Sequence, residues 1–167
     1  SVLWLLQANY QVEERLCQHA ETLDVDPQRL VFAPRVPTPE HLARHVHADL
    51  FLDTFPVNAH TTAADALWMG LPVLTRYGRS FSSRVALSLL HGCQSPDTAA
   101  APSVDLVNTL AVDKAADYAT RAVALAQNPP LLHSLQQHLK TQRERLPLFD
   151  AALTCQHLES GYLGMCQ

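Results

Sequence analysis

The sequence predicts an α/β fold, a parallel sheet with helices on both faces, followed by C-terminal helices. Short apolar runs alternate with helical patterns in the first half of the 167-residue chain. Each run is too short for a helix and too uniformly apolar for a half-exposed antiparallel strand, so it is typical of a strand buried on both faces. Strands that alternate with helices across short loops are typical of a parallel sheet.

The predicted elements follow one another in a regular order. The expected strands cover residues 2–6, 30–33, 50–52 and 72–75, and the helices between and after them cover 11–23, 39–47, 61–69 and 80–90. Residues 95–103, rich in Pro, Ala and Ser, are expected to form an exposed loop, and helices are expected over 112–127, 130–145 and 151–163. We expect one domain over 1–167, with the βα core in about 1–93 and a mostly helical part over 104–167.

The composition is that of an ordinary soluble domain, with 47% hydrophobic and 17% charged residues. A net charge of −4 gives no reason to expect nucleic acid or an anionic membrane as a partner. No apolar run reaches the roughly 20 residues that span a bilayer, and no signal peptide is visible. The chain opens on an apolar strand without an initiator methionine, so we expect it to be a piece of a longer protein.

The cysteines show no spacing of a zinc site. We expect Cys17, Cys93, Cys155 and Cys166 to be reduced thiols, which favours the cytoplasm. A disulfide between Cys155 and Cys166 is the alternative.

A His-Thr-Thr stretch lies where the third predicted helix begins, just after strand 50–52. In open parallel sheets, ligands bind beyond the carboxyl ends of the strands. A helix N-terminus there offers unpaired N–H groups and a partial positive charge, which suit a phosphate group. The hydroxyls of Thr61 and Thr62 can add donors, and His60 can donate a proton or carry charge.

The same stretch has a purely structural interpretation. Thr62 and Asp65 fit a capping box, in which Thr62 caps the helix and Asp65 reaches back to its start, and Thr61 is an alternative cap. His41 and Arg44 are three residues apart and share a helix face, which is either a second part of the site or a solvated surface. His45 and His47 point to different faces, so we expect no metal site there.

Two other classes of protein fit the pattern less well. A dinucleotide-binding dehydrogenase would carry Gly-x-Gly-x-x-Gly after its first strand, and Gln7 to Val12 contains no glycine. A non-enzymatic receiver-like domain would show a cluster of acidic residues at the strand ends, where this chain has only Asp49 and Asp53.

An ordered set of motifs resembles the protein O-GlcNAc transferases over nearly the whole chain. The motifs are "SVLWLL" at residues 1–6, "HTT" at 60–62 followed by Asp65, "LW-G-PV" over 67–73, "SRVA" over 83–86 and "PLFD" over 147–150. The resemblance implies the Rossmann-like C-terminal half of a GT-B glycosyltransferase. It further implies UDP-GlcNAc as donor, inverting transfer of GlcNAc to Ser or Thr of acceptor proteins, no required metal or other cofactor, and upstream TPR repeats that recruit the acceptors.

The resemblance also implies a set of UDP-binding residues. His41 and Arg44 match positions near the uracil, and Val36 matches a position whose backbone meets the base. His60, Thr61 and Thr62 match positions around the diphosphate. Asp65 matches the carboxylate that holds the ribose hydroxyls.

Other positions depart from the family or fall outside the chain. Thr38 lies where animal relatives carry a lysine, so one contact with ribose or phosphate is altered. Arg84 matches a family arginine that makes either a structural pairing or a ligand contact. The family's diphosphate-facing Gln and Lys are expected just upstream of residue 1, and its catalytic base in the other half. A related enzyme that uses a UDP-sugar, an N-linking glucosyltransferase or a UDP-GlcNAc epimerase, is the alternative.

Overall fold

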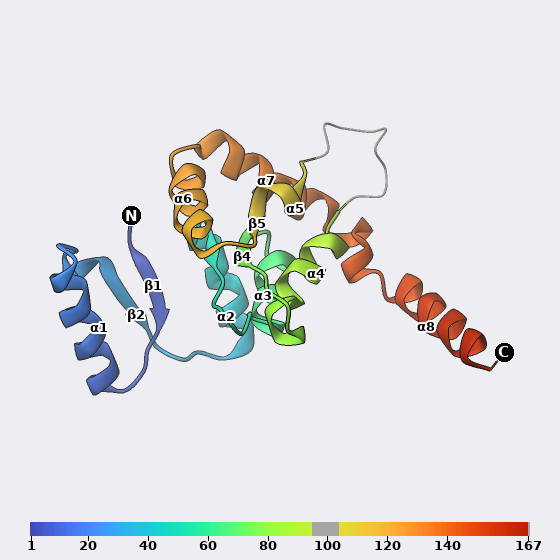
Figure 1. Cartoon of the computed structure of the whole chain (residues 1–167), viewed down its shortest axis with the longest axis horizontal. Coiled ribbons are helices and arrows are strands. Elements are labelled where there is room, and N and C mark those ends of the chain that lie inside the picture. The colour runs from blue at the N-terminus through green and yellow to red at the C-terminus, as the bar shows by residue number, and fades with distance from the viewer. Residues whose placement is uncertain (95–103, 167) are drawn as a thin grey trace. The chain divides into compact units, whose positions relative to one another are not determined.

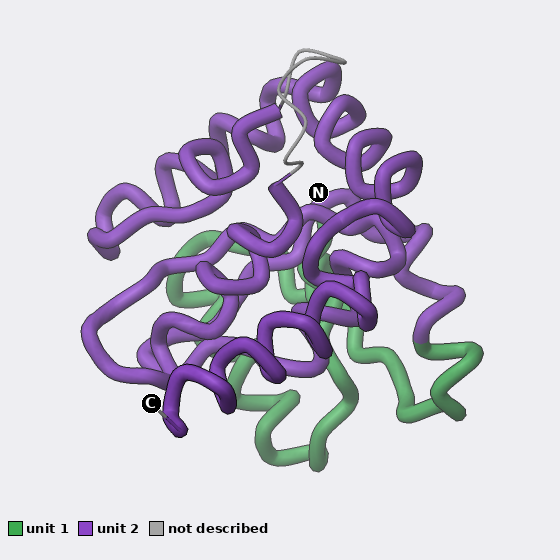
Figure 2. The backbone as a smooth tube through the Cα atoms, turned by 90° about the vertical axis from the view of Figure 1, so that its right-hand side faces the viewer, with its two compact units in different colours: residues 1–41 green, residues 42–167 purple. Residues whose placement is uncertain are grey.

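The computed structural model describes residues 1–94 and 104–166, and its contacts divide the chain into two compact units, Ser1–His41 and Leu42–Gln167 (Figure 2). The loop expected over 95–103 lies outside the described residues. The expectation of one domain over 1–167 stays a prediction.

The first unit is a strand–helix–strand unit whose two strands are parallel. It contains β1 (Leu3–Leu6), α1 (Tyr10–Thr22), the short 3-10 helix η1 (Pro27–Arg29) and β2 (Leu30–Ala33), and Leu3 is opposite Leu30 in the register. The side chain of Asn9 caps α1 by accepting a hydrogen bond from the backbone N–H of Val12. These elements confirm the predicted strands 2–6 and 30–33 and the helix between them.

The predicted helix over 39–47 is two shorter helices. It divides into α2 (Thr38–Ala43) and the 3-10 helix η2 (Arg44–His47). The side chain of His45 is buried, with Nδ1 3.2 Å from the carbonyl oxygen of Leu42.

The second unit is built around β4 (Val73–Arg76), which lies between β3 (Phe51–Leu52) and β5 (Ala111–Val112), both parallel to it. Figure 1 labels β4 and β5. The strand order is β3-β4-β5, with Phe51 opposite Val73 and Thr75 opposite Ala111. Helices α3, α4, α5 and α6 all pack against β4. The elements are β3 (Phe51–Leu52), α3 (Thr61–Trp68), β4 (Val73–Arg76), η3 (Phe81–Ser83), α4 (Val85–Gly92), α5 (Leu106–Leu110), β5 (Ala111–Val112), α6 (Ala115–Ala126), α7 (Pro129–Gln142), η4 (Arg143–Arg145), η5 (Pro147–Phe149) and α8 (Ala151–Met165).

The hydrophobic core of this unit lies on β4 and the helices around it. Val73, Leu74 and Thr75 are each 0% exposed. Leu67 from α3, Leu90 from α4 and other fully buried aliphatic side chains complete the core, namely Leu106, Leu110, Leu125, Leu135, Leu139 and Leu146. A strand buried on both faces explains why residues 72–75 read as a uniformly apolar run.

The second half contains a strand that the sequence did not predict. We expected helices only after residue 104, with one starting at 112, but Val112 belongs to β5 and α6 starts at Ala115. A strand of two residues shows no periodicity, so the apolar residues beside it merge with the helical pattern that follows. The predicted helix over 80–90 is divided into η3 and α4. The hydrogen bond from the Ser83 hydroxyl to the Ser80 carbonyl closes a separate turn at its start.

The cysteines are free thiols, so the alternative pairing of Cys155 with Cys166 is not present. Burial raises the pKa of the Cys93 thiol to about 12. Among the helices of the described residues, none combines the length and the hydropathy needed to cross a bilayer.

Gly70 ends α3 in a left-handed conformation, with a φ of 83°. The N–H of Gly70 donates to the carbonyl of Leu67 (3.0 Å), and the N–H of Leu71 donates to that of Ala66 (2.8 Å), which is a Schellman motif. This turn leads directly into β4, so it fixes where the core strand begins. The predicted stop of the helix at Gly70 is confirmed.

Replacement of Gly70 by alanine is expected to lower the free energy of unfolding by about 1–2 kcal/mol, because an L-residue in this region of φ is strained. A Cβ there would also press on the side chain of Lys140. For a chain of this size, the melting temperature should fall by about 2–8 °C. The control is Gly161→Ala in α8, where no atom lies within 4 Å of the added Cβ and the melting temperature should not fall. Equal melting temperatures for the two variants would contradict the presence of backbone strain at Gly70→Ala.

Candidate functional site

The start of α3 has no capping side chain. His60 is the N-cap residue, with φ −104° and ψ −92°, and no side chain makes a cap hydrogen bond. Thr61 and Thr62 are the first two residues of the helix, and both are exposed, as is His60. The predicted capping box is therefore wrong, because Thr62 lies inside the helix and Asp65 is too far along it. Among the described residues, no side chain caps the first-turn N–H groups, and neither threonine hydroxyl makes a hydrogen bond.

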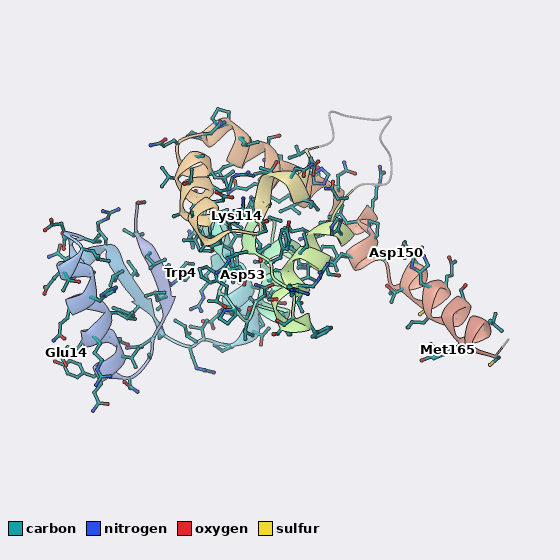
Figure 3. The ribbon with its side chains drawn as sticks, viewed as in Figure 1. Trp4, Glu14, Asp53, Lys114, Asp150 and Met165 are labelled. Carbon is teal, nitrogen blue, oxygen red and sulfur yellow. The ribbon has the colours of Figure 1, made fainter. Side chains whose placement is uncertain are left out.

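A buried carboxylate shapes the loop that leads to this helix. Asp53, labelled in Figure 3, directly follows β3. Its side chain is buried, with 3% of its surface exposed. Its Oδ1 accepts hydrogen bonds from the N–H of Thr54 (2.8 Å) and of Ala59 (2.7 Å), and its Oδ2 accepts one from the Thr75 hydroxyl (2.6 Å). The bond to Ala59 fixes the backbone immediately before His60. Asp53 therefore joins the end of β3, the core strand β4 and the entrance of α3.

Asn58 closes the same loop from its other side. Its Nδ2 donates to the carbonyls of Thr54 (3.0 Å) and Arg76 (3.2 Å), and its backbone N–H donates to the carbonyl of Ser82 (2.9 Å). Asn58 is 4% exposed, and its buried Oδ1 has no hydrogen-bond partner within residues 1–94 and 104–166. The loop over 53–60 is thus hydrogen-bonded both to β4, through Arg76, and to η3, through Ser82.

Burial has the largest effect on the pKa of Asp53. Loss of solvation raises the pKa of Asp53 above its ordinary value, and the hydrogen bonds from Ala59, Thr75 and Thr54 and the charge of His60 lower it by less. The hydroxyl of Tyr118 donates to the backbone carbonyl of Asp53 at 2.8 Å. Burial, and to a lesser degree the charge of Asp53, raises the pKa of Tyr118.

The raised pKa of Asp53 predicts a pH-dependent stability difference between the wild type and Asp53→Asn. A group whose pKa is higher in the folded than in the unfolded state binds its proton more tightly when folded, so stability is lost as the pH rises through both values. We expect the wild type to lose stability relative to Asp53→Asn as the pH rises from about 3 through the ordinary aspartate pKa of about 3.9 towards neutrality. Denaturant unfolding across this range measures the difference. A constant difference, or one of opposite sign, would contradict the prediction.

Asp65 lies on the same face of α3 as Thr61, one helical turn away. Its side chain is half-buried. Within the described residues, its carboxylate makes no hydrogen bond or ion pair with the protein. The carboxylate is therefore available to accept hydrogen bonds from a ligand.

The remaining predicted site residues lie in two different units. Val36, half-buried, follows β2, and His41 lies on α2, both in the first unit. Arg44 opens η2 in the second unit. The structure thus brings together His60, Thr61, Thr62 and Asp65 on one helix. No group of three metal-ligating side chains comes together in the part of the chain that the structure describes.

Three residues around this site are not among the predicted site residues. Asp53 was predicted only as an acid at a strand end, and neither Asn58 nor Phe81 was predicted to have a role. An acid directly after an apolar run, with a threonine in the next predicted strand, was the available signal, because a buried carboxylate needs hydrogen-bond donors close by. Phe81 carries no such signal, since its contact with His60 depends on the tertiary fold.

Comparison with known proteins adds the family. The family model of glycosyl transferase family 41 matches residues 1–158. The chain belongs to glycosyl transferase family 41. It is 34% identical over 99% of its length to the Arabidopsis thaliana "Probable UDP-N-acetylglucosamine--peptide N-acetylglucosaminyltransferase SEC". It is 33% identical over 95% of its length to the UDP-N-acetylglucosamine--peptide N-acetylglucosaminyltransferase of Caenorhabditis elegans. The chain spans 16% and 13% of these two proteins.

A solved structure agrees with this membership of family 41. A mutant of the O-GlcNAc transferase of Thermobaculum terrenum superposes with a TM-score of 0.81 at 27% identity, over 96% of this chain and 29% of that one. The match confirms the predicted fold class, an α/β domain of the GT-B glycosyltransferase type with parallel strands. It also confirms the resemblance on which the predicted site residues rest.

Proposed function

We propose that this chain is the donor-binding part of a UDP-GlcNAc:protein O-linked N-acetylglucosaminyltransferase, an enzyme that transfers GlcNAc to Ser or Thr with inversion. The observation that carries the proposal is the uncapped, exposed start of α3, preceded by His60 and held by the buried Asp53. Its free N–H groups and hydroxyls suit a diphosphate. Membership of glycosyl transferase family 41 supports the reaction class.

Each predicted site residue has a role in this proposal. His60, Thr61 and Thr62 bind the diphosphate, and Asp65 accepts hydrogen bonds from the ribose hydroxyls. His41 and Arg44 lie near the uracil, and the backbone of Val36 meets the base. Three of these groups lie on α3 and His60 directly precedes it, which supports the first half of this assignment, because helix geometry places Asp65 one turn beyond Thr61 along the same face.

The chemistry needs charge stabilisation at the leaving group. In the reaction, a bond forms between the acceptor oxygen and the anomeric carbon of GlcNAc, and the bond from that carbon to the β-phosphate oxygen breaks. UDP leaves with the electron pair, and the acceptor proton goes to a base that we place outside this chain. Fixed N–H groups at a helix start stabilise the developing charge without reorganisation, so we propose that no metal or other cofactor is required.

The partners follow from the same reaction. We propose UDP-GlcNAc as donor and acceptor proteins that are recruited by the rest of the parent protein, with neither nucleic acid nor membrane as a partner. The free cysteines favour the cytoplasm. Thr38 lies where animal relatives carry a lysine, so one ribose or phosphate contact is missing or altered in this proposal.

A crystal structure of the 167-residue chain with UDP tests the binding site. We expect UDP within hydrogen-bond distance, about 3 Å, of residues in the set His41, Arg44, His60, Thr61, Thr62 and Asp65. UDP lying more than about 5 Å from all of them would end the proposal. A donor-hydrolysis assay of the full-length parent with UDP-GlcNAc, UDP-GalNAc and UDP-glucose separates this donor from that of the N-linking glucosyltransferase.

The isolated chain is expected to bind UDP equally well with and without EDTA, and to transfer no GlcNAc. The helix start supplies the positive potential that a metal would otherwise supply, while the base lies elsewhere. Isothermal titration measures the binding, and a radiolabelled acceptor-protein assay measures the transfer, with the full-length parent as the positive control. Binding that disappears in EDTA would contradict the metal-free site. Transfer at a rate near that of the parent would contradict the assignment of the base.

A further inference from the structure

A large aromatic side chain lies exposed beside the start of α3. Phe81 opens η3, and 83% of its surface is exposed. Its ring meets the imidazole of His60 edge-on, with the ring centroids 6.4 Å apart and the planes at 87°. Phe81 therefore borders the candidate phosphate site without being part of the core.

The turn that carries Phe81 is held by its own hydrogen bonds. The N–H of Gly78 donates to the carbonyl of Ser83 (2.9 Å), and the Ser83 hydroxyl donates to the carbonyl of Ser80 (2.9 Å). The bond from Asn58 N–H to the Ser82 carbonyl (2.9 Å) ties this turn to the loop before α3. These bonds hold the backbone on either side of Phe81.

The polar groups along α3 give the site a direction. Asp65 lies one turn inside the helix, Thr61 and Thr62 open it, and His60 precedes it. Phe81 contacts His60, the member of this row that is farthest from Asp65 along the chain. A nucleotide sugar has the same linear order of parts, with the nucleoside at one end, the diphosphate in the middle and the sugar at the other end. With ribose at Asp65 and diphosphate at the helix start, the sugar reaches Phe81.

The surface next to Phe81 has the mixed character that a hexose needs. A groove beside its ring is lined by apolar side chains, among them Val85 and Leu89, and by the polar side chains of Arg84, Ser88 and His91. A hexose presents an apolar face of C–H groups and a rim of hydroxyls. Aromatic and apolar walls with a few polar groups are the usual lining of such a subsite.

We propose that Phe81 is a specificity-determining residue that packs against the hexose ring of the bound nucleotide sugar. The inference rests on the proposed function, because it takes the place of UDP from there. Phe81 contributes to the affinity for the sugar and not to that for the nucleotide.

Isothermal titration of the 167-residue chain with UDP and with UDP-GlcNAc tests the inference. Phe81→Ala and Phe81→Leu are expected to weaken UDP-GlcNAc binding about three- to tenfold relative to UDP, the range that an aromatic contact adds, while UDP affinity changes by less than twofold. Phe81→Tyr keeps the ring and should restore the wild-type ratio of the two affinities. Tyr162→Ala, an exposed aromatic on α8, is the matched control and should leave both affinities unchanged.

The outcomes separate this inference from the function on which it rests. A wild type that does not bind UDP overturns the proposed function, and this inference with it. A wild type that binds UDP while Phe81→Ala leaves the ratio unchanged overturns the role of Phe81 alone. A loss of UDP affinity equal to that of UDP-GlcNAc also overturns it, because Phe81 then contacts the nucleotide. Since the side chain is exposed, the variants should fold, and matching far-UV spectra check this.

Discussion

Replacement of Asp65 by alanine is expected to weaken UDP binding about ten- to a hundredfold and to leave the melting temperature within about 2 °C of the wild type. A hydrogen bond to a charged acceptor contributes about 1.5–3 kcal/mol, and every 1.4 kcal/mol is about tenfold in affinity. The Asp65 carboxylate has no hydrogen-bond partner among the described residues, and it takes no part in capping α3. Its loss therefore removes ligand contacts and not contacts of the fold.

Isothermal titration with UDP and a thermal melt on the same variant measure the two effects. Glu159→Ala on α8 removes one exposed negative charge elsewhere and controls for the net charge. Asp65→Asn keeps the size and one acceptor oxygen, so its affinity should lie between those of the wild type and Asp65→Ala. An unchanged UDP affinity combined with a clearly lowered melting temperature would show that Asp65 serves the fold.

The helix that carries Asp65 was predictable because its signals are local. An apolar face at helical spacing, Gly70 at the end and the His-Thr-Thr start are all visible in the sequence, and α3 covers Thr61–Trp68 against a predicted 61–69. The predicted capping box was wrong because the local sequence is compatible with several helix start positions that differ by one residue. Tertiary contacts decided among them, since the bond from Ala59 N–H to Asp53 sets the backbone before His60.

The parts that were missed depend on contacts between distant residues. β5 has two residues and exists because it pairs with β4, which no local pattern records. The partners of Asp53 come from the next strand, through Thr75, and from α6, through Tyr118. The family resemblance supplied the roles of the site residues, but the scaffold that positions them became visible only in the structure.

Replacement of Asp53 by alanine is expected to lower the free energy of unfolding by about 3 kcal/mol. The change leaves the N–H of Ala59 and the hydroxyl of Thr75 without their acceptor, and each buried unsatisfied group costs about 1–3 kcal/mol. For a chain of this size, the melting temperature should fall by about 6–12 °C. The loop before His60 loses its anchor, so UDP affinity should fall as well, at a temperature where the variant is still folded.

The matched variant is Thr75→Val, which removes the hydroxyl on Oδ2 and keeps the bond between Ala59 and Asp53. It should cost about 1 kcal/mol of stability and leave UDP affinity close to that of the wild type, because the backbone before His60 stays anchored. Denaturant unfolding and isothermal titration on both variants give the comparison. If Asp53→Ala and Thr75→Val changed UDP affinity equally, the carboxylate would support the sheet without positioning the start of α3. A larger loss of affinity in Asp53→Ala identifies Asp53 as the residue that holds His60 and the first turn of α3 in place for the diphosphate.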